Sequence, residues 1–137
     1  MEALGRAGFR VNAGNVTNGA IGEGGEAGDP AAIFARDMAW LEEVAREGGA
    51  LVAEVTTPSL GVGYEIAAAR HRFGIPVVAL YRPEASRRCS AMVAGDPGVV
   101  LVAYAEGALE EAVEAVARAL RARAETAINA GGRGLPG

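Results

Sequence analysis

Residues 50–69, ALVAEVTTPSLGVGYEIAAA, constrain the fold more than any other part of the chain. Residues 50–55 form a short apolar run rich in Val, which is typical of a strand buried on both faces. Pro58 and Ser59 end this run, and the pattern then becomes helical over residues 64–73. A strand that feeds a helix through a Gly/Ser turn leaves backbone N–H groups at the positive end of the helix dipole, where a phosphate can bind.

The rest of the chain continues the alternation of helix and strand. Asp29 and Pro30 are a strong helix start, because Asp caps the first turn and Pro fits its first position. Further patterns predict strands over residues 75–81 and 98–105, a long helix over 108–127, and a short strand over 9–12. We expect an α/β fold with a doubly wound, Rossmann- or flavodoxin-like parallel sheet of about four to five strands in three αβα layers. Residues 1–127 would be one domain and residues 128–137 a disordered tail.

Composition narrows the class of protein. With 137 residues, 50% hydrophobic and 22% charged, the chain fits one compact domain. Its net charge of −4 argues against a nucleic-acid polymer or an anionic membrane as partner. A single cysteine, Cys89, excludes an internal disulfide, and a single histidine, His71, excludes a His-based metal cluster. With no apolar run of membrane-spanning length and no signal peptide, we expect a cytoplasmic protein, and we expect no metal and no cofactor.

Two acidic residues stand out from the helical patterns. Glu65 has only small, uncharged neighbours three and four residues away, so it is either solvated or held for chemistry. Asp37 interrupts an apolar stripe, although its neighbour Arg36 is expected on a different helix face. A buried, unpaired acid costs free energy, so this position indicates a function or a buried partner. The simpler alternative for Glu65 is that acids favour the first turns of any helix.

Several of these motifs occur together in one known family. PSLGVGYE, with Glu54 upstream, RDMAWL before it and RPEASRRCSAM after it, closely resembles the 2'-deoxynucleoside 5'-phosphate N-hydrolases of the nucleoside 2-deoxyribosyltransferase superfamily. The resemblance extends over about residues 8–120. It implies hydrolysis of the N-glycosidic bond of (2'-deoxy)nucleoside 5'-monophosphates to free base and (deoxy)ribose 5-phosphate. By resemblance, Glu65 is the nucleophile, and Asp37 assists departure of the base and then attack by water.

The resemblance also implies binding residues and a partner. Ser59, Gly61 and Gly63 would hold the 5'-phosphate, and Ser90 would reach the phosphate bound in a second subunit, which implies a homodimer. A plain helix cap is the alternative for Ser90. Asn15 replaces a family histidine at the base, so we expect it to bind substrate while base preference stays open. The implied partners are a small-molecule nucleotide and a second copy of the chain.

The chain also departs from the family pattern. The family's first strand and Gly-rich turn have no counterpart before residue 9, so we expect an N-terminally truncated chain. Residues 14–29 are rich in Gly and Asn, which predicts a mobile loop. Three other functions stay open: a nucleoside 2-deoxyribosyltransferase, a nucleotide-binding module without catalysis, and a cytokinin-activating phosphoribohydrolase. The residues leave both the base and the choice of ribose or deoxyribose undecided.

Overall fold

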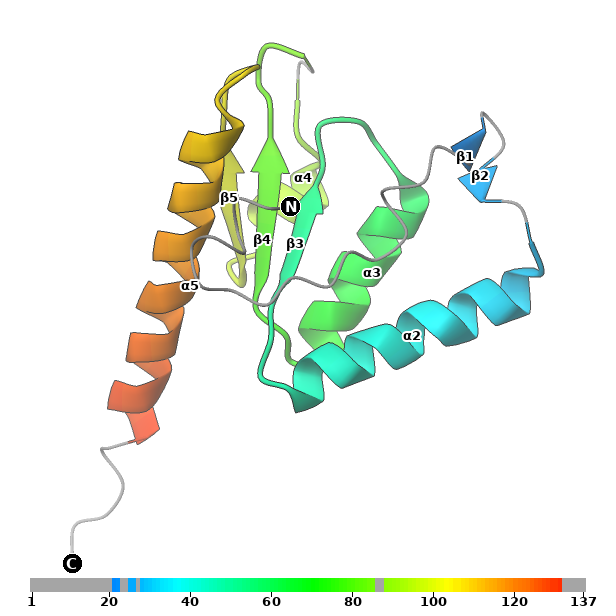
Figure 1. Ribbon diagram of the computed structural model, residues 1–137, viewed down its shortest axis with the longest axis horizontal. Coiled ribbons are helices and arrows are strands. Elements are labelled where there is room, and N and C mark those ends of the chain that lie inside the picture. The colour runs from blue at the N-terminus through cyan, green and yellow to red at the C-terminus, as the bar shows by residue number, and fades with distance from the viewer. Residues whose placement is uncertain (1–20, 23–24, 27, 86–87, 132–137) are drawn as a thin grey trace, which may run out of the picture.

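A computed structural model of the chain describes residues 21–22, 25–26, 28–85 and 88–131 (Figure 1). In chain order the elements are β1 (Ile21–Gly22), β2 (Gly25–Glu26), α2 (Pro30–Arg46), β3 (Leu51–Glu54), α3 (Leu60–His71), β4 (Val77–Tyr81), α4 (Ala91–Gly95), β5 (Val99–Ala103) and α5 (Leu109–Gly131).

The main sheet is parallel, with strand order β3-β4-β5. Leu51 of β3 is paired with Val77 of β4, which in turn is paired with Val99 of β5. Helices lie on both faces, so the predicted three-layer α/β fold is confirmed. The prediction of four to five strands is wrong for the described part of the chain, where this sheet has three. The fourth strand, predicted over residues 9–12, lies outside the described residues.

The central strand β4 connects two hydrophobic cores. All five of its residues are buried, and alternate side chains point to opposite faces of the sheet. Val77 and Ala79 pack with residues of α2, α3 and α4, whereas Val78 and Leu80 pack with Ala112 and Val116 of α5. These two cores hold the helices against the sheet and fix the strand ends from which the candidate site is built.

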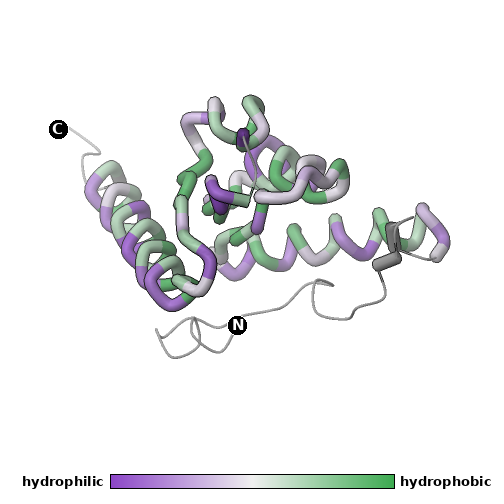
Figure 2. Tube along the Cα trace, turned by 90° about the horizontal axis from the view of Figure 1, so that it is seen from above, coloured by the Kyte–Doolittle hydropathy of each residue, from purple (hydrophilic) through white to green (hydrophobic). Residues whose placement is uncertain are grey.

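The long helices α2 and α5 are both amphipathic, and hydrophobic and hydrophilic positions alternate with their turns (Figure 2). Asp29 caps α2 as predicted, because its carboxylate accepts hydrogen bonds from the N–H groups of Ala31 and Ala32 at 3.4 and 3.3 Å. Helix α5 continues to Gly131, four residues beyond its predicted end at residue 127. The added turn is Ile128, Asn129, Ala130 and Gly131, so the helix ends at the first glycine after residue 107.

The segment predicted as a loop, residues 14–29, contains a minimal antiparallel pair. Strand β1 is paired with β2, with Ile21 opposite Glu26. The predicted substrate residue Asn15 lies outside the described residues.

Candidate active site

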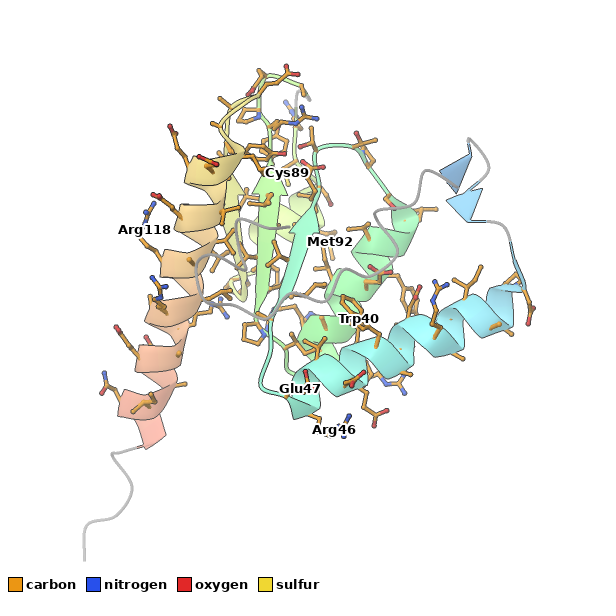
Figure 3. All side chains as sticks on the ribbon, viewed as in Figure 1. Trp40, Arg46, Glu47, Cys89, Met92 and Arg118 are labelled. Carbon is orange, nitrogen blue, oxygen red and sulfur yellow. The ribbon has the colours of Figure 1, made fainter. Side chains whose placement is uncertain are left out.

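The candidate site lies at the carboxyl ends of two neighbouring strands. The loop after β3 carries Ser59, and the loop after β4 carries Ser90. Because β3 and β4 are adjacent and parallel, both loops leave the sheet at the same edge, where open α/β sheets bind their ligands. Figure 3 places Cys89, the neighbour of Ser90, at this end of the sheet, whereas Arg46 and Glu47 lie near the opposite end.

Helix α3 begins at Leu60, earlier than the prediction of residue 64. Ser59 is its N-cap, and its Oγ accepts a hydrogen bond from the N–H of Val62 at 3.3 Å. Gly61 and Gly63 therefore lie in the helix and not in the preceding turn. The two glycines hid the helix start in the sequence, because Gly disfavours helix interiors but is tolerated in a capped first turn.

The surface around these glycines is open. A Cβ atom added at Gly63 would meet nothing within 4 Å, and one added at Gly61 would lie 3.9 Å from Ser59 Oγ. Neither glycine is therefore required by packing within the described structure. Because the first N–H groups of a helix have no intrahelical acceptor, this turn of α3 offers hydrogen-bond donors beside an unobstructed surface.

The two candidate acids lie on helices that pack together. Asp37 is on α2 and Glu65 on α3, and these helices share one hydrophobic core. Glu65 directly precedes the buried Ile66, and Asp37 directly precedes the buried Met38. Both acids are partly buried, so both lie at the margin of that core.

An aromatic contact links the same two helices close to the acids. The rings of Phe34 and Tyr64 lie edge to face, with centroids 6.1 Å apart. Phe34 is one turn before Asp37, and Tyr64 is next to Glu65. The two predicted catalytic residues thus lie on neighbouring helices, close in sequence to a contact between those helices.

Asp37 has a cationic partner from its own helix. Its Oδ1 accepts hydrogen bonds from Arg36 Nε at 2.9 Å and from the guanidinium NH2 at 2.8 Å. Arg36 was expected on a different face of α2, but its long side chain nevertheless reaches the neighbouring carboxylate. Asp37 is therefore ion-paired with Arg36 at the margin of the core.

Ser90 occupies the N-cap position of α4, but its hydroxyl makes no capping hydrogen bond. Its side chain is exposed, and its C=O accepts from the N–H of Ala94 at 2.9 Å. Capping of α4 therefore does not explain why this position carries a hydroxyl group. Cys89 packs partly against the core as a small hydrophobe, and burial raises the pKa of its thiol.

A polar cluster that sequence reasoning missed joins the three strand ends. Thr56 is only 3% exposed, and its Oγ1 accepts a hydrogen bond from the N–H of Arg82 at 2.9 Å. The Thr56 hydroxyl also contacts the Glu54 carboxylate at hydrogen-bond range. Burial raises the pKa of Tyr104, and the Glu54 carboxylate raises that pKa further. The available signal was that Glu54, Arg82 and Tyr104 all come at the ends of predicted strands.

Arg82 lies next to this cluster and is only partly paired. In the described part of the chain, Arg82 Nε is a buried side-chain nitrogen without a hydrogen-bond partner. Next to it, Glu84 Oε1 accepts from the N–H of Glu106 at 2.7 Å. Hydrogen bonds from backbone N–H groups lower the pKa of Glu84.

The described residues offer neither a metal-binding cluster nor a membrane-spanning helix. No group of three or more His, Cys, Asp or Glu side chains there is placed to bind a metal ion. In the same residues, no helix combines the length and apolar character needed to cross a membrane.

Comparison with known proteins points to one family. A protein of Branchiostoma floridae named 5-hydroxymethyl-dUMP N-hydrolase is 52% identical over 69 residues, which are 50% of this chain and 61% of the relative. A Mus musculus protein of the same name is 48% identical over 69 residues, 50% of this chain and 37% of the relative. This chain is a homologue of nucleotide N-hydrolases. The predicted resemblance is thereby confirmed.

A bacterial protein is similar to the chain over a longer stretch. A protein of Syntrophotalea carbinolica, named provisionally as a 2'-deoxynucleoside 5'-phosphate N-hydrolase, is 51% identical over 85 residues, 62% of this chain and 56% of the relative. The chain thus spans 37–61% of the length of these three curated relatives. No family model matches the chain.

Proposed function

We propose that this chain hydrolyses the N-glycosidic bond of (2'-deoxy)nucleoside 5'-monophosphates to free base and (deoxy)ribose 5-phosphate. One observation carries the proposal: Ser59 and Glu65 lie on the same helix, at its N-cap and second turn, and Asp37 lies on the helix packed against it. Six residues of α-helix extend about 9 Å, which is within the length of one nucleotide. A phosphate at the start of α3 would place the sugar beside Glu65.

The chemistry needs two carboxylates with different tasks. As the bond between C1' and the base nitrogen breaks, oxocarbenium character develops at C1', and the Glu65 carboxylate adds to C1'. Asp37 assists departure of the base by passing a proton to it. In the second step water attacks C1', Asp37 accepts a proton from the water, and Glu65 leaves as a carboxylate.

The 5'-phosphate would be held by the first turn of α3. The Ser59 hydroxyl and the N–H groups of this turn are donors, and Gly61 and Gly63 leave the approach open. The names of the relatives, which specify 5'-phosphates or dUMP, support a phosphorylated substrate. They also favour hydrolysis over transfer of the sugar to a second base.

We further propose that the chain acts as a cytoplasmic homodimer in which Ser90 completes the phosphate site of the second subunit. Leu60 and Met92 support this arrangement, because they are 97% and 85% exposed beside Ser59 and Ser90. Large apolar side chains at such positions are typical of a contact surface.

Release of free base from a panel of deoxynucleoside and ribonucleoside 5'-monophosphates tests the proposal. We expect release from 5'-monophosphates, little from unphosphorylated nucleosides, and a loss of roughly 10³-fold or more in Glu65→Gln. Glu125→Gln, an exposed acid on α5, is the matched control and should keep full activity. Mass spectrometry of a trapped intermediate should find a sugar phosphate on the peptide that contains Glu65. Release that survives Glu65→Gln, or no release by the unaltered chain, contradicts the proposal.

A further inference from the structure

The strongest unassigned feature is the hydrogen-bond cluster around the buried Thr56, at the carboxyl ends of β3, β4 and β5. It contains Glu54, Thr56, the N–H of Arg82 and Tyr104, and we call it the strand-end cluster. None of these groups has a part in the chemistry proposed above. A buried polar cluster costs free energy unless every member is satisfied, so its presence next to a site needs a reason.

Thr56 is the centre of the strand-end cluster. Its N–H donates to both carboxylate oxygens of Glu54 at 3.3 Å, and its hydroxyl binds the same carboxylate. The hydroxyl oxygen also accepts from the N–H of Arg82 at 2.9 Å. One buried side chain therefore joins the end of β3 to the end of β4, across 26 residues of sequence.

The third strand joins through Tyr104. Its N–H donates to the C=O of Tyr81 at 3.0 Å, which continues the ladder between β4 and β5 past the strand ends. Its side chain is partly buried and packs against the core under α5, and burial, followed by the nearby Glu54 charge, raises its pKa.

The two loops joined by Thr56 are the two that carry the candidate phosphate serines. Thr56 comes three residues before Ser59, which begins the helix of Glu65. Arg82 comes eight residues before Ser90. The hydrogen bond between Thr56 and Arg82 therefore links the starts of these two loops directly.

We propose that Thr56, held by Glu54 and by the N–H of Arg82, is a positioning residue that aligns the start of α3 for recognition of the 5'-phosphate. This inference rests on the proposed function and adds a determinant of phosphate specificity that does not touch substrate. Misplacement of binding groups by about 1 Å is enough to lower catalysis strongly. Loss of the Thr56 hydroxyl should therefore weaken discrimination between nucleotide and nucleoside.

The test compares Thr56→Val with Thr56→Ser. Val keeps the shape of the buried side chain but leaves the N–H of Arg82 without its acceptor, whereas Ser keeps the hydroxyl. The readout is the ratio of kcat/KM for a deoxynucleoside 5'-monophosphate to kcat/KM for the unphosphorylated deoxynucleoside. We expect Thr56→Val to lower this ratio roughly tenfold, mainly through KM for the nucleotide, and Thr56→Ser to stay within about threefold of the unaltered chain.

Thr57→Val is the matched control, because Thr57 is the exposed neighbour. Glu54→Gln, at an exposed position, keeps the inference testable if Thr56→Val does not fold, and it should lower the same ratio. An equal loss on both substrates, or an unchanged ratio in a folded Thr56→Val variant, overturns the inference. So does an unchanged ratio in Glu54→Gln.

Calorimetric binding separates this inference from the proposed function. If the unaltered chain binds the 5'-monophosphate but releases no base, hydrolysis is wrong. The positioning role is then read from Kd, which Thr56→Val should raise for the nucleotide and not for the nucleoside. If the unaltered chain does not distinguish the two ligands in binding or turnover, the positioning role is wrong as well.

Discussion

Phe34 of α2 and Tyr64 of α3 meet edge to face, with ring centroids 6.1 Å apart and ring planes inclined by 77°. Both rings are substantially exposed, at 47% and 60%, so the contact is not a product of core packing. It lies beside the two candidate catalytic acids and joins the helices that carry them. The two rings therefore form a direct contact between the helices that carry Asp37 and Glu65.

The first prediction concerns this aromatic pair. A double-mutant cycle with Phe34→Leu and Tyr64→Leu should give a coupling free energy of about 0.5–1.5 kcal/mol in urea unfolding. Each single variant should also lower kcat for base release several-fold, because the acids shift relative to each other. Leu109→Ala, an exposed apolar residue of α5, should leave kcat unchanged. Zero coupling would show that the two rings are independent.

The second prediction separates stability from binding at the start of α3. Because a Cβ atom at Gly63 meets nothing within 4 Å, Gly63→Ala should stabilise the fold by up to about 1 kcal/mol. The added methyl would obstruct the phosphate, so kcat/KM for the 5'-monophosphate should fall roughly tenfold or more.

Gly95→Ala is the control for this substitution, since Gly95 lies in α4 with equally open surroundings. It should leave kcat/KM near that of the unaltered chain. If Gly63→Ala loses no activity, the phosphate does not approach this turn.

The third prediction concerns Gly98 at the other end of the sheet. A Cβ atom there would lie 1.8 Å from the Arg70 guanidinium, which binds Asp96 at 2.9 Å. Gly98→Ala should displace Arg70 and lower Tm by roughly 2–8 °C. In an Asp96→Asn background Gly98→Ala should lower Tm by much less, because the ion pair between Arg70 and Asp96 is already broken. An equal decrease in Tm in both backgrounds would show that displacement of Arg70 from Asp96 is not the cause.

The fourth prediction is a pH dependence of stability. The hydrogen bond from Arg70 is the main cause that lowers the pKa of Asp96, followed by the bond from the N–H of Gly98. A carboxyl with a lowered folded-state pKa contributes stability above its unfolded pKa of about 3.9 and loses it as pH falls through the folded value. Urea unfolding should therefore find the unaltered chain more stable than Asp96→Asn at pH 7.

This difference should shrink below about pH 4 and vanish at still lower pH. A difference that stays constant over the whole range would mean that the Asp96 charge has no part in it. Because Asp96 lies at the amino end of β5, away from the candidate site, both variants should keep their activity at pH 7.

Local patterns were sufficient to predict much of this molecule. The cap at Asp29, the three parallel strands and the acids Asp37 and Glu65 follow from rules that act over a few residues, namely capping, alternation and helical period. The start of α3 was misjudged because two glycines outweighed the capping signal of Ser59. The resemblance of PSLGVGYE to a family added the expected reaction, which no periodicity implies.

The tertiary structure decided what connects these elements. Thr56 binds Arg82 across 26 residues of sequence, and Arg70 binds Asp96 across the same separation. Such contacts depend on how parallel strands are brought side by side by their crossover helices, which no short window of sequence records. The sequence by itself therefore determined which residues are available for chemistry. Only the packing of α2 on α3 and of β3 on β4 decided which of them lie together.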